Sequence, residues 1–195
     1  MTRLTVAIVF ALLAATAATA APLTPLERQR LLAHMDVTER WLIDELSGLS
    51  PAQLAFRPAP GSWNILEVLD HLVVVGPIYW RDLQNARPVR SGPVGSMTDA
   101  DVLWYGFDRT NREIALRTEV PTTRLTNLAS GLEAYRTQHA QLRRYIRETE
   151  DDLRRRLVER QRSDAYQWAL LISTHEQRHI LQIREIKAHP EYPTR

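Results

Sequence analysis

The stretch WNILEVLDHLVVVGPIYWRDLQ, residues 63–84, decides the fold more than any other part of the chain. Between Ile65 and Trp80 it is apolar on nearly every side of a helix, and Ser62 precedes it as a candidate N-cap. We expect a helix here, and we expect it to be the most buried helix of the protein. Such a helix needs other helices around it, which favours a helical bundle.

Further helices are expected on both sides of this stretch. Residues 24–48 begin with TPLE, in which Thr24 is a candidate N-cap with a glutamate three residues later. A shorter helix is expected over 98–116, and SGLE at 130–133 opens another long one. The last helix is expected over about 164–188. Four long helices with two long connections predict an all-α four-helix bundle with long crossover connections.

The first 20 residues have the pattern of a secretory signal peptide. Arg3 supplies a basic start, residues 4–15 are apolar, and residues 18–20 are small enough for cleavage. We therefore expect an exported protein, periplasmic or secreted, whose domain spans residues 22–190. An uncleaved N-terminal anchor is the alternative. No stable membrane span is expected after cleavage, since no other segment is as apolar over that length.

Charge and cysteine content narrow the function classes. The chain has 25 lysines and arginines against 23 acidic residues, so no strong field favours nucleic acid, and none is expected as a partner. Residues 143–162 are dense in arginine, but acidic residues alternate with them, which predicts a solvated helix end and loop. Cysteine is absent, so stability must come from packing, with help from a metal if one is bound.

Histidines supply the candidate functional residues. HEQRH at 175–179 places His175 and His179 about 40° apart around a helix, so both can bind one metal ion. The chain has six histidines, and chance can produce one such pair. His71 lies inside the apolar stretch, where an imidazole needs a hydrogen-bond partner or a metal. It is therefore either a third ligand or a core histidine bonded to a backbone carbonyl.

The motif H-E-x-x-H also occurs in zinc proteases, but the surrounding sequence does not fit one. A protease of this kind needs a third ligand downstream, for example in H-x-x-G-x-x-H. Gln182 stands where the glycine would be, and Glu185 stands where the histidine would be. Glu176 points about 100° away from His175 around the helix, and we expect it to be solvated. A protease is therefore disfavoured.

Two segments together resemble the DinB-like family, a family of four-helix bundles. They are RPAPGSWNILEVLDHL at 57–72 and, about a hundred residues later, HEQRHILQI at 175–183. The resemblance covers essentially the whole chain after the predicted signal peptide. It implies that His71, His175 and His179 form a metal triad, and that the metal is nickel, zinc or manganese. It also allows a homodimer, since dimers are common in the family.

Other side chains near these anchors receive lesser roles. His34 and His139 lie on amphipathic helices and are expected in the core or at the surface. Glu67, one turn before His71, is left out of the ligand set. The resemblance places Trp63 at the cavity end of its helix, and Gln182 either lines the same pocket or is buried against a helix.

The function expected from this resemblance is metal-dependent hydrolysis of a small-molecule substrate. Characterised relatives include thiol S-transferases, and many others are labelled metal-dependent hydrolases. Thiol transfer is the first alternative. It ranks below hydrolysis because the small-thiol cosubstrates of those relatives are cytosolic, whereas this chain is expected to be exported. A non-catalytic, metal-stabilised stress or binding protein is the second. General acid and base residues are not predicted.

Overall fold

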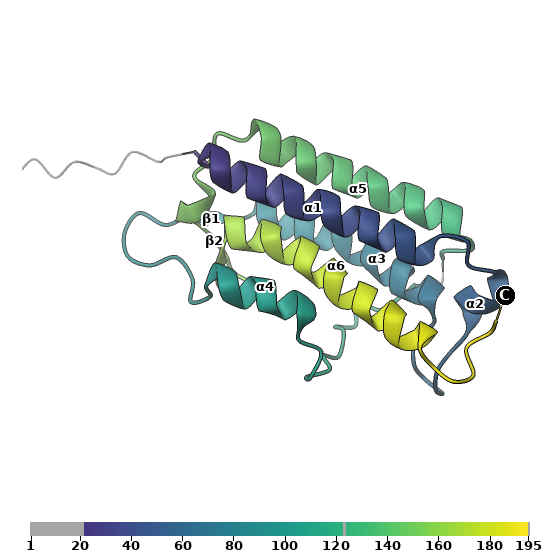
Figure 1. Ribbon diagram of the computed structural model, residues 1–195. Coiled ribbons are helices and arrows are strands. Elements are labelled where there is room, and N and C mark those ends of the chain that lie inside the picture. Colours follow the sequence, from purple (N-terminus) through teal and green to yellow (C-terminus); the bar gives the residue numbers. More distant parts are fainter. Residues whose placement is uncertain (1–21, 123, 195) are drawn as a thin grey trace, which may run out of the picture.

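Four long helices pack side by side in the computed structural model, which describes residues 22–122 and 124–194. They are α1 (Pro25–Leu46), α3 (Ile65–Gln84), α5 (Leu128–Glu148) and α6 (Ala165–Lys187). The short helices α2 (Pro51–Ala55) and α4 (Asp99–Phe107) lie in the connections. In Figure 1, α4 lies along the outer side of α6, and α1 lies beside α5. The predicted all-α four-helix bundle is confirmed.

A small antiparallel sheet, which the sequence did not predict, closes one end of the bundle. Its strands are β1 (Arg87–Pro88), β2 (Arg156–Val158) and β3 (Ser163–Asp164), in the order β1-β2-β3. A single 3₁₀ turn, η1 (Leu153–Arg155), precedes β2. Residues 143–162 were expected to form a solvated helix end and loop, but η1 and β2 within this segment pack against the end of the bundle. Arg154 in η1 is about two-thirds buried and forms ion pairs with carboxylates of three other elements, at Glu27, Asp99 and Asp164.

The start of α3 differs from the prediction by two residues. Asn64, not Ser62, is the N-cap: its side chain accepts from the Glu67 amide at 2.8 Å, and the Glu67 carboxylate accepts from the Asn64 amide at 3.0 Å. Ser62 instead exchanges hydrogen bonds with the backbone of Ala59, which closes the preceding turn. Glu67 therefore serves as a cap and takes no part in the histidine cluster described below.

Two further helix boundaries also differ. The helix predicted over 98–116 ends at Phe107, because the Asp108 carboxylate accepts from the Thr110 amide at 2.9 Å and turns the chain away. The helix predicted to open at 130 begins at Leu128, since Asn127 provides the N-cap for the amide of Ser130. Both differences come from asparagine or aspartate side chains that bond to nearby backbone. The predicted bounds of α6 are confirmed to within a residue.

The most buried helix is α6, not α3 as predicted. Every residue from 163 to 180 is buried, because α1 and α3 cover α6 on the inside while α4 covers it on the outside. The close approach of α4 needs Gly106, where a Cβ would lie 2.8 Å from the Gln177 side chain and 3.1 Å from the Thr174 carbonyl. The polar residues of α6 as far as His179 are consequently inside the protein.

A proline inside α3 is compensated by a side chain from α5. Pro77 has no N–H, so the carbonyl of Val73 loses its helical donor. The Gln138 side-chain amide donates to that carbonyl at 2.9 Å. Gly76 makes this possible, because a Cβ there would lie 2.0 Å from the Gln138 side-chain oxygen. The interruption therefore fixes how α3 and α5 are aligned.

None of the helices in the described part of the chain is long and apolar enough to cross a bilayer. The predicted signal peptide, residues 1–20, lies outside the described residues.

Candidate metal centre

Three buried histidines come together between α3 and α6. His71 projects from α3, and His175 and His179 project from α6, with candidate ligand atoms within 4.8 Å of one another. The Nε2 atom of His175 lies 3.1 Å from Nε2 of His179 and 3.4 Å from Nε2 of His71. Two nitrogens each about 2.0–2.1 Å from a tetrahedral ion are about 3.3 Å apart. The observed spacing therefore fits a shared metal ion.

Hydrogen bonds hold the outer ring nitrogens of two of these histidines. Nδ1 of His71 donates to the Glu119 carbonyl at 2.6 Å, and Nδ1 of His179 donates to the Gln182 side-chain oxygen at 2.8 Å. Each bond leaves Nε2 unprotonated and directed toward His175. His71 thus has the backbone carbonyl partner of a core histidine and also belongs to the cluster, so the two alternatives for it do not exclude each other.

The inner nitrogens have an electrostatic conflict that a cation would resolve. Nε2 of His175 carries at most one proton, so only one of its two close nitrogen contacts can be a hydrogen bond. The other contact brings two lone pairs together. A divalent ion bound at the centre would accept all three lone pairs, and neutral imidazole nitrogen is a common ligand for such ions. The residues present therefore fit a metal.

Burial keeps these imidazoles in the neutral form that binds metals. Burial lowers the pKa of His71, and the bond to the Glu119 carbonyl opposes this shift only in part. Burial also holds the pKa of His175 and of His179 well below the ordinary value, and the neighbouring imidazoles add to the effect. No proton therefore has to leave these rings before a metal binds at neutral pH.

A cavity of about 980 Å³ opens beside the three histidines. The Trp63 ring forms one wall, with its centroid 4.9 Å from that of His71 and 6.2 Å from that of His179. Gln182 also lines the cavity, as one of its two expected roles required. An ion held by these three histidines would have a coordination position open to the cavity, as in catalytic rather than closed structural sites.

Glu176 is buried and faces away from the cluster, so the prediction that it is solvated was wrong. Its two carboxylate oxygens accept from the Tyr135 hydroxyl at 3.0 Å and from Nε2 of His139 at 2.7 Å, both on α5. Nδ1 of His139 lies 3.4 Å from a carboxylate oxygen of Glu39 on α1, close enough for an ion pair but outside hydrogen-bond geometry. Glu176 therefore links α6 to α5, whereas a protease would direct this residue toward the metal.

The remaining histidines stay outside the cluster. His34 is half-buried and bonds through Nδ1 to the Ser173 hydroxyl at 2.9 Å, whereas His139 lies in the core, in the buried network around Glu176. Both agree with the expectation of a core or surface role. His189 lines the cavity and packs against Phe56.

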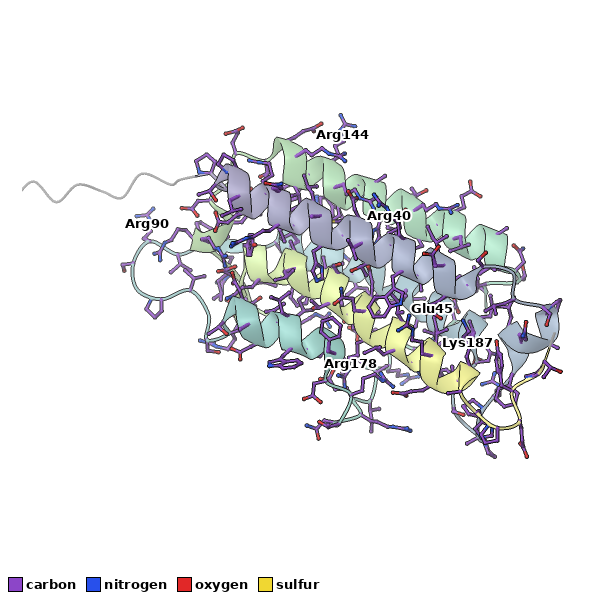
Figure 2. All side chains as sticks on the ribbon, in the orientation of Figure 1. Arg40, Glu45, Arg90, Arg144, Arg178 and Lys187 are labelled. Carbon is purple, nitrogen blue, oxygen red and sulfur yellow. The ribbon has the colours of Figure 1, made fainter. Side chains whose placement is uncertain are left out.

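The contacts that hold the α4–α5 connection along the cavity were not predicted from the sequence. Arg178 donates to the carbonyls of Tyr105, Asp108 and Asn111, at and beyond the end of α4. In Figure 2 the labelled Arg178 lies beside that end of α4. The carbonyl of Glu119, which bonds to His71, belongs to the same connection. Backbone acceptors leave no residue pattern, so nothing in the sequence could have identified these contacts.

Fold and site together define a helical-bundle protein with a three-histidine candidate metal site beside an open cavity. Residues 34–183 match the DinB superfamily, so the chain belongs to that family. The chain is also similar to the uncharacterised protein YuaE of Bacillus subtilis strain 168, with 30% identity over 154 residues that cover 76% of this chain and 91% of YuaE. No solved structure matches the chain at a comparable level.

Proposed function

We propose that the protein binds one divalent metal ion through His71, His175 and His179, and that the metal-loaded site hydrolyses a small organic substrate. The observation that carries this proposal is the convergence of three Nε2 atoms next to a cavity of about 980 Å³. Nε2 of His175 lies 3.1 Å from that of His179 and 3.4 Å from that of His71. A cavity of this volume is of the size that holds a small organic molecule.

Zinc or nickel suits this site better than manganese. All three ligand atoms are imidazole nitrogens, which zinc and nickel accept readily, whereas manganese favours carboxylate, carbonyl and water oxygens. Glu176 and Glu67 are both bonded elsewhere, so neither adds an oxygen to the ligand set.

The chain's own residues would position the reactants. When bound, the ion would act as a Lewis acid and lower the pKa of a bound water or thiol, so that a nucleophile is available near neutral pH. The Glu119 carbonyl and Gln182 hold the outer nitrogens of His71 and His179, which fixes the directions of their Nε2 atoms. Trp63 packs against both rings, tilted against that of His71 and stacked on that of His179, and so supports their orientation on the cavity side.

Hydrolysis is preferred to thiol transfer because of the N-terminal sequence. Residues 1–20 have the pattern of a signal peptide, so we propose that the domain over residues 22–190 works outside the cytoplasm, in the periplasm or secreted. The small-thiol cosubstrates of thiol S-transferases are cytosolic. A reporter fused to the C-terminal end of the chain should be exported when residues 1–20 are present and retained in the cytoplasm when they are deleted. Retention of both fusions would remove the preference for hydrolysis.

The metal proposal is tested by metal analysis of the full chain purified without an affinity tag. Wild type should hold close to one equivalent of metal, and His71→Ala and His179→Ala should each lose most of it. His34→Ala removes a histidine that bonds to Ser173 instead, and it should keep the metal. Equal metal content in all four proteins would defeat the proposal, and retained metal without activity on ester and amide panels would favour a binding protein.

A further inference from the structure

The cavity beside the histidines has an uneven charge. Among the described residues that line it are four arginines and three glutamates: Arg109, Arg112, Arg160, Arg178, Glu113, Glu119 and Glu185. The metal that we propose would add two more positive charges.

Two of the arginines are neutralised by partners within the same wall. Arg109 binds both carboxylate oxygens of Glu185, at 2.6 and 2.9 Å. Arg160 binds Glu119 at 2.5 Å and also reaches Asp82 on α3 at 2.6 Å. These pairs account for two glutamates and leave two arginines and one glutamate.

Arg178 is the more buried of the two remaining arginines. The residue is 6% exposed, and its guanidinium donates to three backbone carbonyls, with no carboxylate of the described residues at ion-pair distance. The carbonyls at the end of α4 carry only a partial negative charge, which compensates part of the guanidinium charge. Arg178 therefore leaves a net positive charge near His175, whose pKa it helps to lower.

Arg112 is the more accessible one. It lies in the loop that follows α4, is exposed, lines the cavity, and has no ion pair or hydrogen bond to the rest of the described chain. Its neighbour Glu113 accepts from the Tyr105 hydroxyl at 3.2 Å. Tyr105, Tyr79 and Trp63 give the same cavity aromatic surface. The charge of Arg112 acts on Glu185 from a distance, since it helps to lower the pKa of that carboxyl. The wall thus combines aromatic rings with positive charge that no carboxylate of the described residues binds directly.

We propose that the cavity takes an organic acid, with its anionic group bound by Arg112 and attracted by Arg178, and its apolar part against the aromatic wall. This names the substrate class of the site and rests on the function proposed above. Because Arg112 is exposed, its contribution to binding is modest and decreases with salt.

Two matched pairs of probes test the charge preference by calorimetry on the metal-loaded full chain. They are phenylacetate with phenylacetamide and benzoate with benzamide, which differ in charge and hardly in shape. The acids should bind at least about tenfold more tightly than the amides. Equal binding of acid and amide, or no binding of either acid at millimolar concentration, would overturn the proposal.

Three variants in one loop locate the effect. Arg112→Gln should weaken acid binding about threefold to tenfold, and Glu113→Gln should strengthen it about twofold to threefold. Arg117→Gln removes an exposed charge from the same loop outside the cavity and should change nothing. The same effect of Arg112→Gln and Arg117→Gln would overturn the role of Arg112.

Metal content of each protein separates this inference from the metal proposal. The three loop variants should keep the wild-type metal content, and the effect of Arg112→Gln on acid binding should persist in chelator. If the wild type holds no metal, the proposed function is wrong. The comparison of acids with amides still tests the charge preference of the cavity in that case. A metal-loaded wild type without that preference would defeat only the present inference.

Discussion

Nε2 of His71 lies 3.4 Å from Nε2 of His175, although 104 positions separate the two residues in the chain. The contact forms because α3 packs against α6 along the centre of the bundle. It turns a pair of histidines on one helix into a three-nitrogen cluster, so that binding of a metal by all three would depend on the tertiary fold.

Metal should stabilise the wild-type protein through this contact. A metal at a hundredfold excess over its Kd adds about 2.7 kcal/mol to the free energy of unfolding, which corresponds to a rise in Tm of about 5–10 °C for a domain of this size. Scanning fluorimetry with zinc or nickel and then with chelator measures it. His71→Ala should show little or no shift, and an undiminished shift in that variant would place the ion elsewhere.

Glu176→Gln should destabilise the protein and leave the metal in place. The substitution removes the charge that faces His139 inside the bundle, so we expect a loss of about 3 kcal/mol in the free energy of unfolding. Denaturant unfolding measures this loss, with the exposed Glu133→Gln on α5 as the control. Loss of metal without loss of stability would mean that Glu176 acts at the metal, as in a protease.

Stability should fall between pH 6.5 and 9 because of His139. Burial alone would lower the pKa of this imidazole, but the charges and contacts of Glu176 and Glu39 raise it to about 9, above the unfolded value of 6.5. Its contribution is therefore complete below pH 6.5 and lost as the pH rises through about 9, a change on the order of 3 kcal/mol.

Chelated wild type and His139→Gln should be compared by denaturant unfolding across this range. The three cluster histidines have lowered pKa values, so their own contribution changes below pH 6.5 and leaves the window clear. The variant should have the flatter profile. Parallel profiles would show that His139 is not charged in the folded protein.

Gln138→Leu should leave the Val73 carbonyl without a donor next to Pro77. An unsatisfied carbonyl of this kind costs about 1–3 kcal/mol in the free energy of unfolding. Chemical denaturation provides the measurement. The exposed Gln141→Leu, one turn further along α5, makes the same change in composition and should have little effect. Similar stabilities of the two variants would show that water or another group satisfies the carbonyl.

The sequence predicted the helices better than their surroundings. Helix spacing and the Thr24 capping pattern depend on residues within a few positions, so α1 and α6 were placed nearly correctly. Ser62 and Asn64 are both good N-caps, and only the reciprocal bond with Glu67 decides between them. Boundaries of this kind depend on which of two local hydrogen bonds forms.

The candidate site was predictable only in part for a related reason. The i, i+4 spacing of His175 and His179 is visible in the sequence, whereas the approach of His71 depends on how two distant helices pack. Glu176 was expected in solvent because the sequence does not show that α5 presents Tyr135 and His139 to it. The Glu119 carbonyl that orients His71 belongs to a backbone whose path no residue pattern specifies.

The most direct test is anomalous diffraction from crystals of the full chain grown with zinc or nickel, measured at the absorption edge of the metal. We expect one strong buried peak about 2.0–2.1 Å from Nε2 of His71, His175 and His179, with a further position open to the cavity. A peak bonded only to surface side chains, or a buried ion that leaves His71 uncoordinated, would contradict it.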